Sequence, residues 1–524
     1  MSEKINFIIN YDEDIDSYIK SNYPHVFDYR IISLSLDARG APRGKVPKYH
    51  AIIDAIKPGE DFNPHRESFP HLGAFKNPPI IIGAGPCGLF SALRFADYGI
   101  PVYLFERGDR AQNRMIHIAK FWRYGAFDPE NNVCYGEGGA GLFSDGKLIT
   151  RVKSPYVQYV MNRFVDFGAP KETAYQSNPH LGSNKIRGLI SKMTSYIESV
   201  GSKVFYNARV DRLLFSEDET RVIGVELSTG EKYFSDYVIL AVGHSAKEMF
   251  YHLHEKKVAM SQKDFAVGVR IEHPRRLIDK LQLGEFCGPI LGSARYRLSY
   301  ENPSSHKGTY SFCMCPGGYV LSSGTDADGI VVNGMSNYKR NSPWSNAALV
   351  VSVQKEKDFS SVHVLEGLKF IENIEKKAFQ LSMEKASGKE IPAQRLKDFL
   401  DQKKSDLSLT KTSTPSGIFS QDLDSLLPKF IVGHLTDALL KFDEQMKGFI
   451  SNEALLLAPE TRTSSPVSIM RDKYSLQSLS HLGLYPCGEG AGHAGGITSA
   501  AVDGVKVAMS IIAQEKNYKD QYGQ

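Results

Sequence analysis

Three glycines and one acidic residue in the first quarter of the chain have the types and spacing of a dinucleotide-binding turn. Gly83, Gly85 and Gly88 form the sequence GAGPCG between an apolar strand-like run and an apolar helical run. The first glycine permits the tight turn, the second lets a pyrophosphate approach the backbone, and the third lets the helix pack close to the strand. Glu106 ends the next apolar run, where a carboxylate accepts hydrogen bonds from a ribose and repels a 2′-phosphate. This pattern therefore predicts a binding site for a dinucleotide that carries no 2′-phosphate on its ribose.

The elements that must position this turn form a β-turn-α-β unit. PIIIGAG is typical of a short buried strand, PCGLFSALRFADYG of an apolar helix, and IPVYLFERG of a second strand. A helix that begins at such a turn offers unpaired N–H groups and a partial positive charge to phosphates. We therefore add Pro86, Cys87 and Arg107, which flank the turn and the acid, to the predicted cofactor contacts.

A second glycine-rich turn lies near the other end of the chain. HLGLYPCGEGAGHAGGITSAAVDGVKVAMSI is typical of a strand, a turn and a helix with small residues on its face. Two such turns favour FAD over NAD, because the second can reach the ribityl chain and the flavin ring; the alternative is a glycine-rich surface turn. Glu489 is placed to accept a hydrogen bond from a ribityl hydroxyl, and the backbone near the ring would raise the reduction potential. The predicted contacts of this turn are Gly488, Glu489, Gly495, Gly496 and Ile497.

Composition and charge are those of an ordinary folded chain with several domains. The 524 residues are 42% hydrophobic and 23% charged, and at about 150 residues per domain they suggest two to four domains. The formal net charge is +4, without a block of like charges. This balance disfavours a dedicated nucleic-acid or membrane-surface protein.

The cysteines and the first residues favour the cytoplasm. The six cysteines contain no CxxC pair and no disulfide framework, which is typical of a reducing compartment. MSEKINFIINYDEDID lacks the long apolar core of a signal peptide, and the most apolar stretch, residues 78–93, is too short to span a membrane. Cys313 and Cys315 form a CxC that could be a strained disulfide or a metal half-site, but two buried thiols are favoured. No metal site is expected.

The remaining chain divides into a small N-terminal unit and larger segments. INFIINY, RIISLSLD and KYHAIIDAI are typical of strands, with a polar helical stretch between the first two, and residues 57–79 resemble a proline-rich linker. Residues 203–244 predict four short strands that return to a sheet, and residues 340–450 predict mainly helices. The expected fold class is α/β, with a discontinuous Rossmann-like FAD-binding domain, an inserted α+β substrate or cap domain and a small N-terminal α/β domain. The predicted boundaries are 1–74, 75–265, 266–455 and 456–524.

Several motifs together resemble a known family, the FAD-dependent dehydrogenases also described as NAD(P)/FAD-dependent oxidoreductases. This family is related in architecture to glutathione-reductase-like and p-hydroxybenzoate-hydroxylase-like flavoproteins. The resemblance runs from about residue 30 to residue 510, and it implies an FAD fold without naming a substrate. The motifs are SLDARG (35–40), GAGPCG (83–88), YGEGGAGLFSDGKL (135–148), AVGHSA (241–246), FAVGVRIEHP (265–274), SFCMCPGG (311–318), ETRTSSPVSI (460–469) and GEGAGHAGGITSAAVDG (488–504).

The resemblance implies further cofactor contacts. In related flavoproteins a loop like YGEGGAGLFSDGKL runs along the pyrophosphate and the flavin, where backbone amides bind anions. A strand that begins like Val210 lies beside the adenine, and Gly243 stands where the chain passes close to the phosphates. The contacts implied in this way are Gly138, Gly139, Gly141, Ser144, Val210 and Gly243.

The candidates for chemistry beyond cofactor binding are two residues near the predicted ring. Arg462 lies among small hydroxyl residues, where its guanidinium could clamp a carboxylate or another anion, or could equally bridge two domains through Glu460. His493 lies in the ring-edge loop and is the preferred acid/base candidate, ahead of His244.

These patterns predict a nucleotide-binding flavoprotein that transfers a hydride between FAD and a small organic substrate. NAD(P)H is a candidate transient reductant, although the chain has no second dinucleotide fingerprint and hence no dedicated NAD(P)H domain. One alternative is a flavin-dependent tRNA-modifying enzyme, which would need a clustered basic face. Another is a non-catalytic flavin-binding scaffold. Neither nucleic acid nor a membrane is an expected partner.

Overall fold

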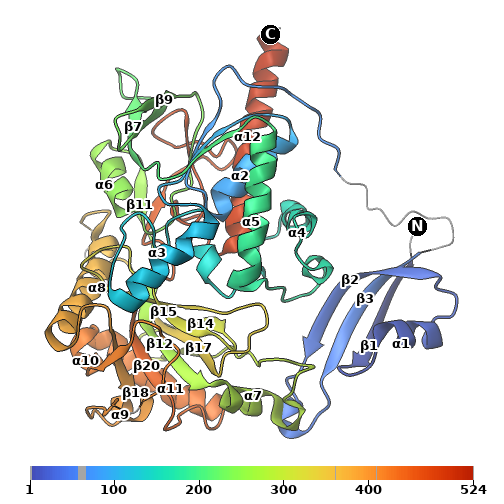
Figure 1. Cartoon of the computed structure of the whole chain (residues 1–524), viewed down its shortest axis with the longest axis vertical. Coiled ribbons are helices and arrows are strands. Elements are labelled where there is room, and N and C mark those ends of the chain that lie inside the picture. Colours follow the sequence, from blue (N-terminus) through green and yellow to red (C-terminus); the bar gives the residue numbers. More distant parts are fainter. Residues whose placement is uncertain (1–2, 57–66, 360–361, 409, 523–524) are drawn as a thin grey trace.

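The N-terminal unit is a three-stranded antiparallel sheet with one helix, and it projects from the main body (Figure 1). The computed structural model describes residues 3–56, 67–359, 362–408 and 410–522. Alternate side chains of the first strand, Ile5, Phe7 and Ile9, are buried, which confirms the predicted strand pattern. The first ten residues of the predicted linker, 57–66, lie outside the described residues. The elements are β1 (Glu3–Asn10), α1 (Ile15–Asn22), β2 (Asp28–Asp37) and β3 (Lys48–Ile56), in the sheet order β1-β3-β2.

A five-stranded parallel sheet forms the core of the first half of the main body, and it joins segments from distant parts of the chain. Its strands read β22-β10-β4-β5-β6, so the C-terminal turn lies two strands away from the first glycine turn. All three residues of β4 and all three of β10 are almost fully buried, as expected for a parallel sheet covered on both faces. The strands are β4 (Ile80–Ile82), β5 (Tyr103–Phe105), β6 (Lys203–Phe205), β10 (Val238–Leu240) and β22 (Leu484–Pro486).

Helices α2 and α12 lie against each other beside this sheet (Figure 1). Helix α12 has the length and apolar character of a membrane span, but 61% of its apolar window is buried inside the protein. Its buried face includes Ala501, Val505 and Ala508 in the same hydrophobic cluster as α2, so this face is a core face here. The helices of this region are α2 (Pro86–Asp97), α3 (Ala111–Tyr124), α4 (Tyr156–Asp166), α5 (Gly182–Ser199), α6 (Lys247–Glu255) and α12 (Ile497–Tyr522).

The segment from residue 203 to residue 244 contains five strands where the sequence predicts four. Strands β6 and β10 both belong to the parallel sheet, whereas the three strands between them in sequence form a separate antiparallel sheet. The short turns favour this local pairing, because antiparallel neighbours need only a tight connection. The additional strands are β7 (Val210–Phe215), β8 (Val222–Leu227) and β9 (Lys232–Phe234).

A seven-stranded sheet forms the second half of the main body, in the order β13-β14-β17-β12-β20-β18-β19. The prediction of mainly helices in residues 340–450 is wrong for β17, because WSNAALVVSV is buried on both faces and therefore shows no alternation. Strand β20 lies at the start of the segment predicted to return to the FAD domain (456–524), but it pairs with β12 and β18 in this sheet. Its strands are β12 (Phe265–Pro274), β13 (Ser299–Glu301), β14 (Gly308–Cys315), β17 (Trp344–Val353), β18 (Ile391–Arg395), β19 (Ile418–Ser420) and β20 (Leu455–Glu460).

Helices and two small strand pairs complete this half. The prediction of helices in residues 340–450 is confirmed for α8 and α11, on which Leu368, Ile371, Ile431 and Leu435 are buried at helical spacing. The pair β11 and β21 links the two halves of the chain. The elements are α7 (Arg275–Leu283), α8 (Glu366–Lys385), α9 (Leu396–Leu400), α10 (Leu423–Leu426), α11 (Lys429–Gln445), β11 (Met260–Gln262), β15 (Tyr319–Ser322), β16 (Val332–Met335) and β21 (Val467–Ile469).

Candidate functional site

A cavity of about 410 Å³ lies where the glycine turns of the parallel sheet face the seven-stranded sheet. Its wall joins segments from the first glycine turn to the start of α12, which are separated by more than three quarters of the chain. Most of the predicted cofactor contacts line it. These are Gly83, Gly85, Pro86, Cys87, Glu106, Arg107, Gly139, Gly141, Ser144, Val210, Gly243, Glu489, Gly495, Gly496 and Ile497.

Three predicted contacts, Gly88, Gly138 and Gly488, are not among the described residues that line this cavity. A Cβ at Gly88 would lie 1.9 Å from the carbonyl oxygen of Gly83, so this glycine permits the close approach of helix and strand that its spacing predicts. The Gly138 N–H donates to the Ala84 carbonyl over 2.8 Å. The Gly488 N–H donates to the Asp503 carboxylate over 2.8 Å. These glycines shape the turns behind the cavity wall.

The carboxylate of Glu106 connects the first turn to the glycine-rich loop. It is 4% exposed and accepts backbone N–H groups from Ala84 (2.8 Å), Gly108 (3.0 Å) and Gly136 (2.8 Å). An ionised carboxylate has about four acceptor positions. One acceptor position therefore remains for the predicted ribose hydroxyl, and the other contacts hold the turn in shape.

The side chain of Glu489 enters the cavity wall without a protein partner. None of the described residues donates a hydrogen bond to its carboxylate, and burial raises its pKa to about 7 against the opposing effect of Lys263. A partly buried acceptor with free lone pairs suits the predicted ribityl hydroxyl, because such a donor would satisfy the carboxylate.

The contribution of Glu489 to the free energy of unfolding of the FAD-free protein is expected to fall as the pH rises from about 4.5 to about 7. A carboxyl group whose pKa is raised by folding keeps its proton in the folded state while the unfolded chain loses it, so rising pH favours unfolding. For Glu489 this window runs from the ordinary pKa of 4.5 to about 7. Urea unfolding of wild type and Glu489→Gln at both ends of the range checks this. The stability difference between the two should grow with pH, and a constant difference would contradict the assignment.

Arg462 lies in the cavity wall, but its guanidinium is fully occupied. Its Nε and Nη2 donate to the Glu375 carboxylate over 3.0 and 2.8 Å, and Nη2 also reaches Asp326 over 3.3 Å. Its Nη1 donates to the hydroxyls of Thr325 and Ser245 over 2.6 and 3.1 Å. A guanidinium has five N–H groups, so none remains for the predicted substrate anion, and the clamp interpretation is wrong.

The alternative prediction, that Arg462 bridges two domains through Glu460, is right about the bridge but wrong about its partner. Glu460 pairs with Arg270, over 2.9 Å between Oε2 and Nε. Arg462 instead links the end of β20 to Glu375 on α8 and to Ser245 before α6. It therefore ties the two halves of the molecule together.

The two candidate histidines differ in their position. His493 is not among the described cavity-lining residues, and its Nε2 lies 3.0 Å from the Ile469 carbonyl. This contact gives it a structural role and does not support the acid/base role. His244 does line the cavity, where burial and then Arg462 lower its pKa to about 4. It is therefore neutral at pH 7.

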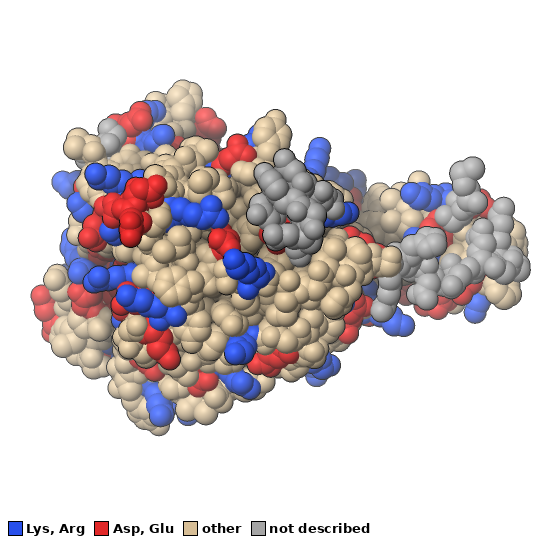
Figure 2. All heavy atoms as spheres, turned by 90° about the horizontal axis from the view of Figure 1, so that it is seen from above, with Lys and Arg blue, Asp and Glu red and all other residues tan. Residues whose placement is uncertain are grey.

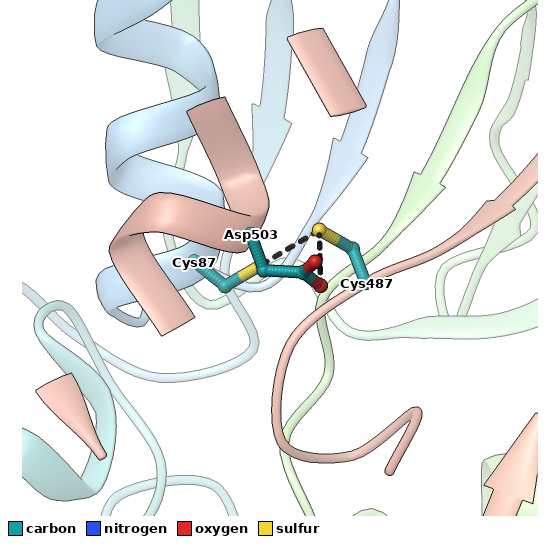
Figure 3. Close-up of side chains that lie close together, drawn as sticks. All are labelled: Cys87, Cys487 and Asp503. Carbon is teal, nitrogen blue, oxygen red and sulfur yellow. Dashed lines mark hydrogen bonds between the residues drawn. The ribbon is translucent and has the colours of Figure 1, made fainter. Parts of the chain in front are cut away.

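Cys87, Cys487 and Asp503 converge behind the two glycine turns (Figure 3). The two sulfurs are 2.9 Å apart, and the Cys487 sulfur lies 3.5 Å from the Asp503 carboxylate. Asp503 forms an ion pair with Arg471 over 2.7 Å and accepts the Gly488 N–H. Burial raises the pKa of the Cys487 thiol, which keeps it protonated. These contacts make the cluster a support for the second turn.

Several cavity residues were not among the predicted site residues, although most of them lie in or beside the motifs that carry the family resemblance. Cys315 is fully buried, as favoured, but Cys313 lines the cavity, at a bulge in β14 with φ of +44°. The others come from strands and loops that reach the cavity only in the folded chain. They include Lys147, Ile149, Phe312, Asn333 and Glu460.

Comparison with known proteins gives two family matches and one relative that is similar over most of its length. Residues 78–276 match the family described as pyridine nucleotide-disulphide oxidoreductase, and residues 264–463 match the family described as FAD-dependent protein, C-terminal domain-like. An uncharacterized protein from Clostridium beijerinckii is 39% identical over 436 residues, which cover 83% of this chain and 80% of that protein.

The solved structures that match this chain share little sequence with it. CtdE in complex with FAD is 11% identical, with a TM-score of 0.31, over 84% of this chain and 89% of CtdE. A geranylgeranyl bacteriochlorophyll reductase-like protein from Thermoplasma acidophilum is 12% identical, with a TM-score of 0.36. That match covers 85% of this chain and 80% of the other.

The cavity wall itself fits FAD. A Cβ at Gly85 would meet only the Gly139 Cα at 3.9 Å, and a Cβ at Gly243 or Gly495 would meet nothing within 4 Å. These glycines therefore border open space, and their missing side chains let a ligand approach the backbone. Glu489 adds an acceptor at the other end. With one match to an FAD-dependent family, one match to an oxidoreductase family and a relative that shares most of its length, this chain belongs to the family of FAD-dependent oxidoreductases and has FAD as its cofactor.

Proposed function

We propose that this protein transfers a hydride between a small organic substrate and its flavin, in the cytoplasm. The observation that carries the proposal is the single cavity that connects the nucleotide-binding turns to β14, β16 and the end of β20. Domain interfaces of this kind are common sites for small ligands. The six cysteines are free thiols, which suits a reducing compartment.

The flavin would supply the hydride chemistry when bound, and the protein would bind and orient its partners. Gly85 and Gly139 offer backbone to the pyrophosphate, Glu106 offers its remaining acceptor position to the ribose, and Glu489 accepts from the ribityl chain. Phe312 and Ile149 line the cavity beside the seven-stranded sheet and would shield a substrate from water there.

The test begins with the purified holoprotein and its visible spectrum. Anaerobic mixing with NADH, NADPH and a panel of small organic acids and alcohols should bleach the flavin with at least one compound. Rapid reduction by NADH or NADPH would identify the transient reductant. A flavin that none of these compounds reduces, but dithionite does, would favour the non-catalytic scaffold.

The face of the molecule in Figure 2 offers no specific support for the tRNA-modifying alternative. Figure 2 shows Lys and Arg interspersed with Asp and Glu over the face in view, without a continuous basic patch. Nucleic-acid binding would need such a patch. Retention of RNA that is lost as salt rises would nonetheless favour that alternative.

A further inference from the structure

Lys147 differs from the other cations of the cavity in its partners. Among the described lysines and arginines that line it, Arg107 and Arg209 each pair with Glu130 over 2.6 Å, and Arg462 pairs with Glu375 over 2.8 Å. The Lys147 ammonium donates to the Met314 carbonyl, and the nearest carboxylate, Asp145, is 3.8 Å away. Its positive charge is therefore the least compensated in the cavity wall.

The carboxylate of Asp145 is already committed elsewhere. Its oxygens accept from Arg340 Nε over 2.9 Å and Nη2 over 2.5 Å, and from the Ser336 hydroxyl. Two cationic side chains, Arg340 and Lys147, thus share one carboxylate. The local field at this end of the cavity favours an anion.

The position of Lys147 suits a substrate site. Its ammonium lies against β14, and the next residue, Leu148, accepts a hydrogen bond from Thr498 in the first turn of α12 over 2.7 Å. The loop is thereby held beside Gly495 and Gly496, where the flavin ring is expected. Lys147 therefore belongs to the redox end of the cavity and not to the nucleotide end.

Neighbouring side chains complement a carboxylate with an apolar skeleton. The side-chain oxygen Oδ1 of Asn333 accepts hydrogen bonds from Arg270 Nη2 over 3.3 Å and from the Gly334 N–H over 2.7 Å. Its amide N–H groups have no partner among the residues that the structure describes, so they can donate to an anion. Phe312 and Ile149 line the same end of the cavity and offer apolar surface.

We propose that this end of the cavity binds a small organic carboxylate, with its acid group held by Lys147 and Asn333 and its carbon skeleton against Phe312 and Ile149. The inference rests on the proposed function, since it names the class of substrate for that reaction. It also transfers the role first considered for Arg462 to a cation that has free donors.

The test measures binding to the oxidised holoprotein and requires no turnover. Benzoate and propionate are titrated while the visible absorption of the flavin is followed, with benzamide as the neutral counterpart of benzoate. At least one carboxylate should perturb the spectrum saturably, and benzamide should bind at least about tenfold more weakly than benzoate, as expected for a charge-assisted hydrogen bond. Added NaCl should weaken binding of the acids alone.

Variants then test whether Lys147 is the cation that binds the carboxylate. Lys147→Met should weaken carboxylate binding about tenfold, Lys147→Arg should retain most of it, and Lys153→Met, which removes an exposed charge nearby, should leave it unchanged. Flavin content and the unfolding midpoint show whether each variant is folded. If Lys147→Met does not fold, the ratio of benzoate affinity to benzamide affinity, measured in wild type and in Lys147→Arg, still tests whether the site binds the carboxylate.

Three results would overturn the proposal: no binding of either acid, equal binding of benzoate and benzamide, or a folded Lys147→Met that binds as wild type does. The proposed oxidoreductase function fails separately. If the carboxylates bind as expected but no compound reduces the flavin, the anion site stands and the hydride-transfer proposal falls.

Discussion

Protein carrying Glu106→Ala is expected to purify with little or no flavin. The substitution leaves the N–H groups of Ala84, Gly108 and Gly136 without their acceptor in a buried place. Each such group costs about 1–3 kcal/mol, so the free energy of unfolding should fall by about 3 kcal/mol or more. The same turn is the proposed cofactor contact, so affinity for FAD and stability should fall together. The ratio of visible to ultraviolet absorbance and urea unfolding measure both.

A matched control separates this effect from loss of any carboxylate. Glu198 is exposed near the end of α5, and Glu198→Ala should leave flavin content unchanged and alter stability by less than about 0.5 kcal/mol. Normal flavin content in Glu106→Ala, with an unchanged urea midpoint, would refute the role of Glu106 in the turn.

The second large loss of stability is expected from substitution of Arg270, whose side chain is fully buried beneath the cavity. Its guanidinium pairs with Glu460 through two hydrogen bonds, over 2.9 and 3.2 Å, and donates to the Asn346 side chain over 2.8 Å. Arg270→Met leaves the Glu460 charge buried and unpaired. Removal of one partner from a buried pair typically costs about 3–5 kcal/mol, so urea unfolding should show a loss of this size.

A second substitution tests whether the unpaired charge causes the loss. The double variant Arg270→Met/Glu460→Leu removes both charges and should recover much of the stability, since an apolar pair avoids the cost of desolvation. Arg276→Met is the surface control, because its pair with Glu453 is largely exposed and should contribute less than about 1 kcal/mol. A single variant as stable as wild type, or a double variant less stable than Arg270→Met, would contradict this account.

Helical and β-turn-α-β patterns were predicted well because their signals are local. The GAGPCG turn, the strands on either side of it and the apolar faces of α8 and α11 follow from short-range spacing. Strand β17 lacks such a local signal, because a strand that is buried on both faces shows no alternation of apolar and polar residues. Its place in the sheet depends on β12 and β14, which lie far from it in sequence.

The chain alone determined where a ligand can approach the backbone, because a missing Cβ is a property of each glycine and needs no partner. It therefore identified both turns and FAD. Only the tertiary structure decided which charged side chains are free. Arg462 and His493 have suitable chemistry but are occupied by Glu375 and Ile469, whereas Lys147 has unoccupied donors. Hydrogen-bond partners come from distant segments, and folding alone brings these together.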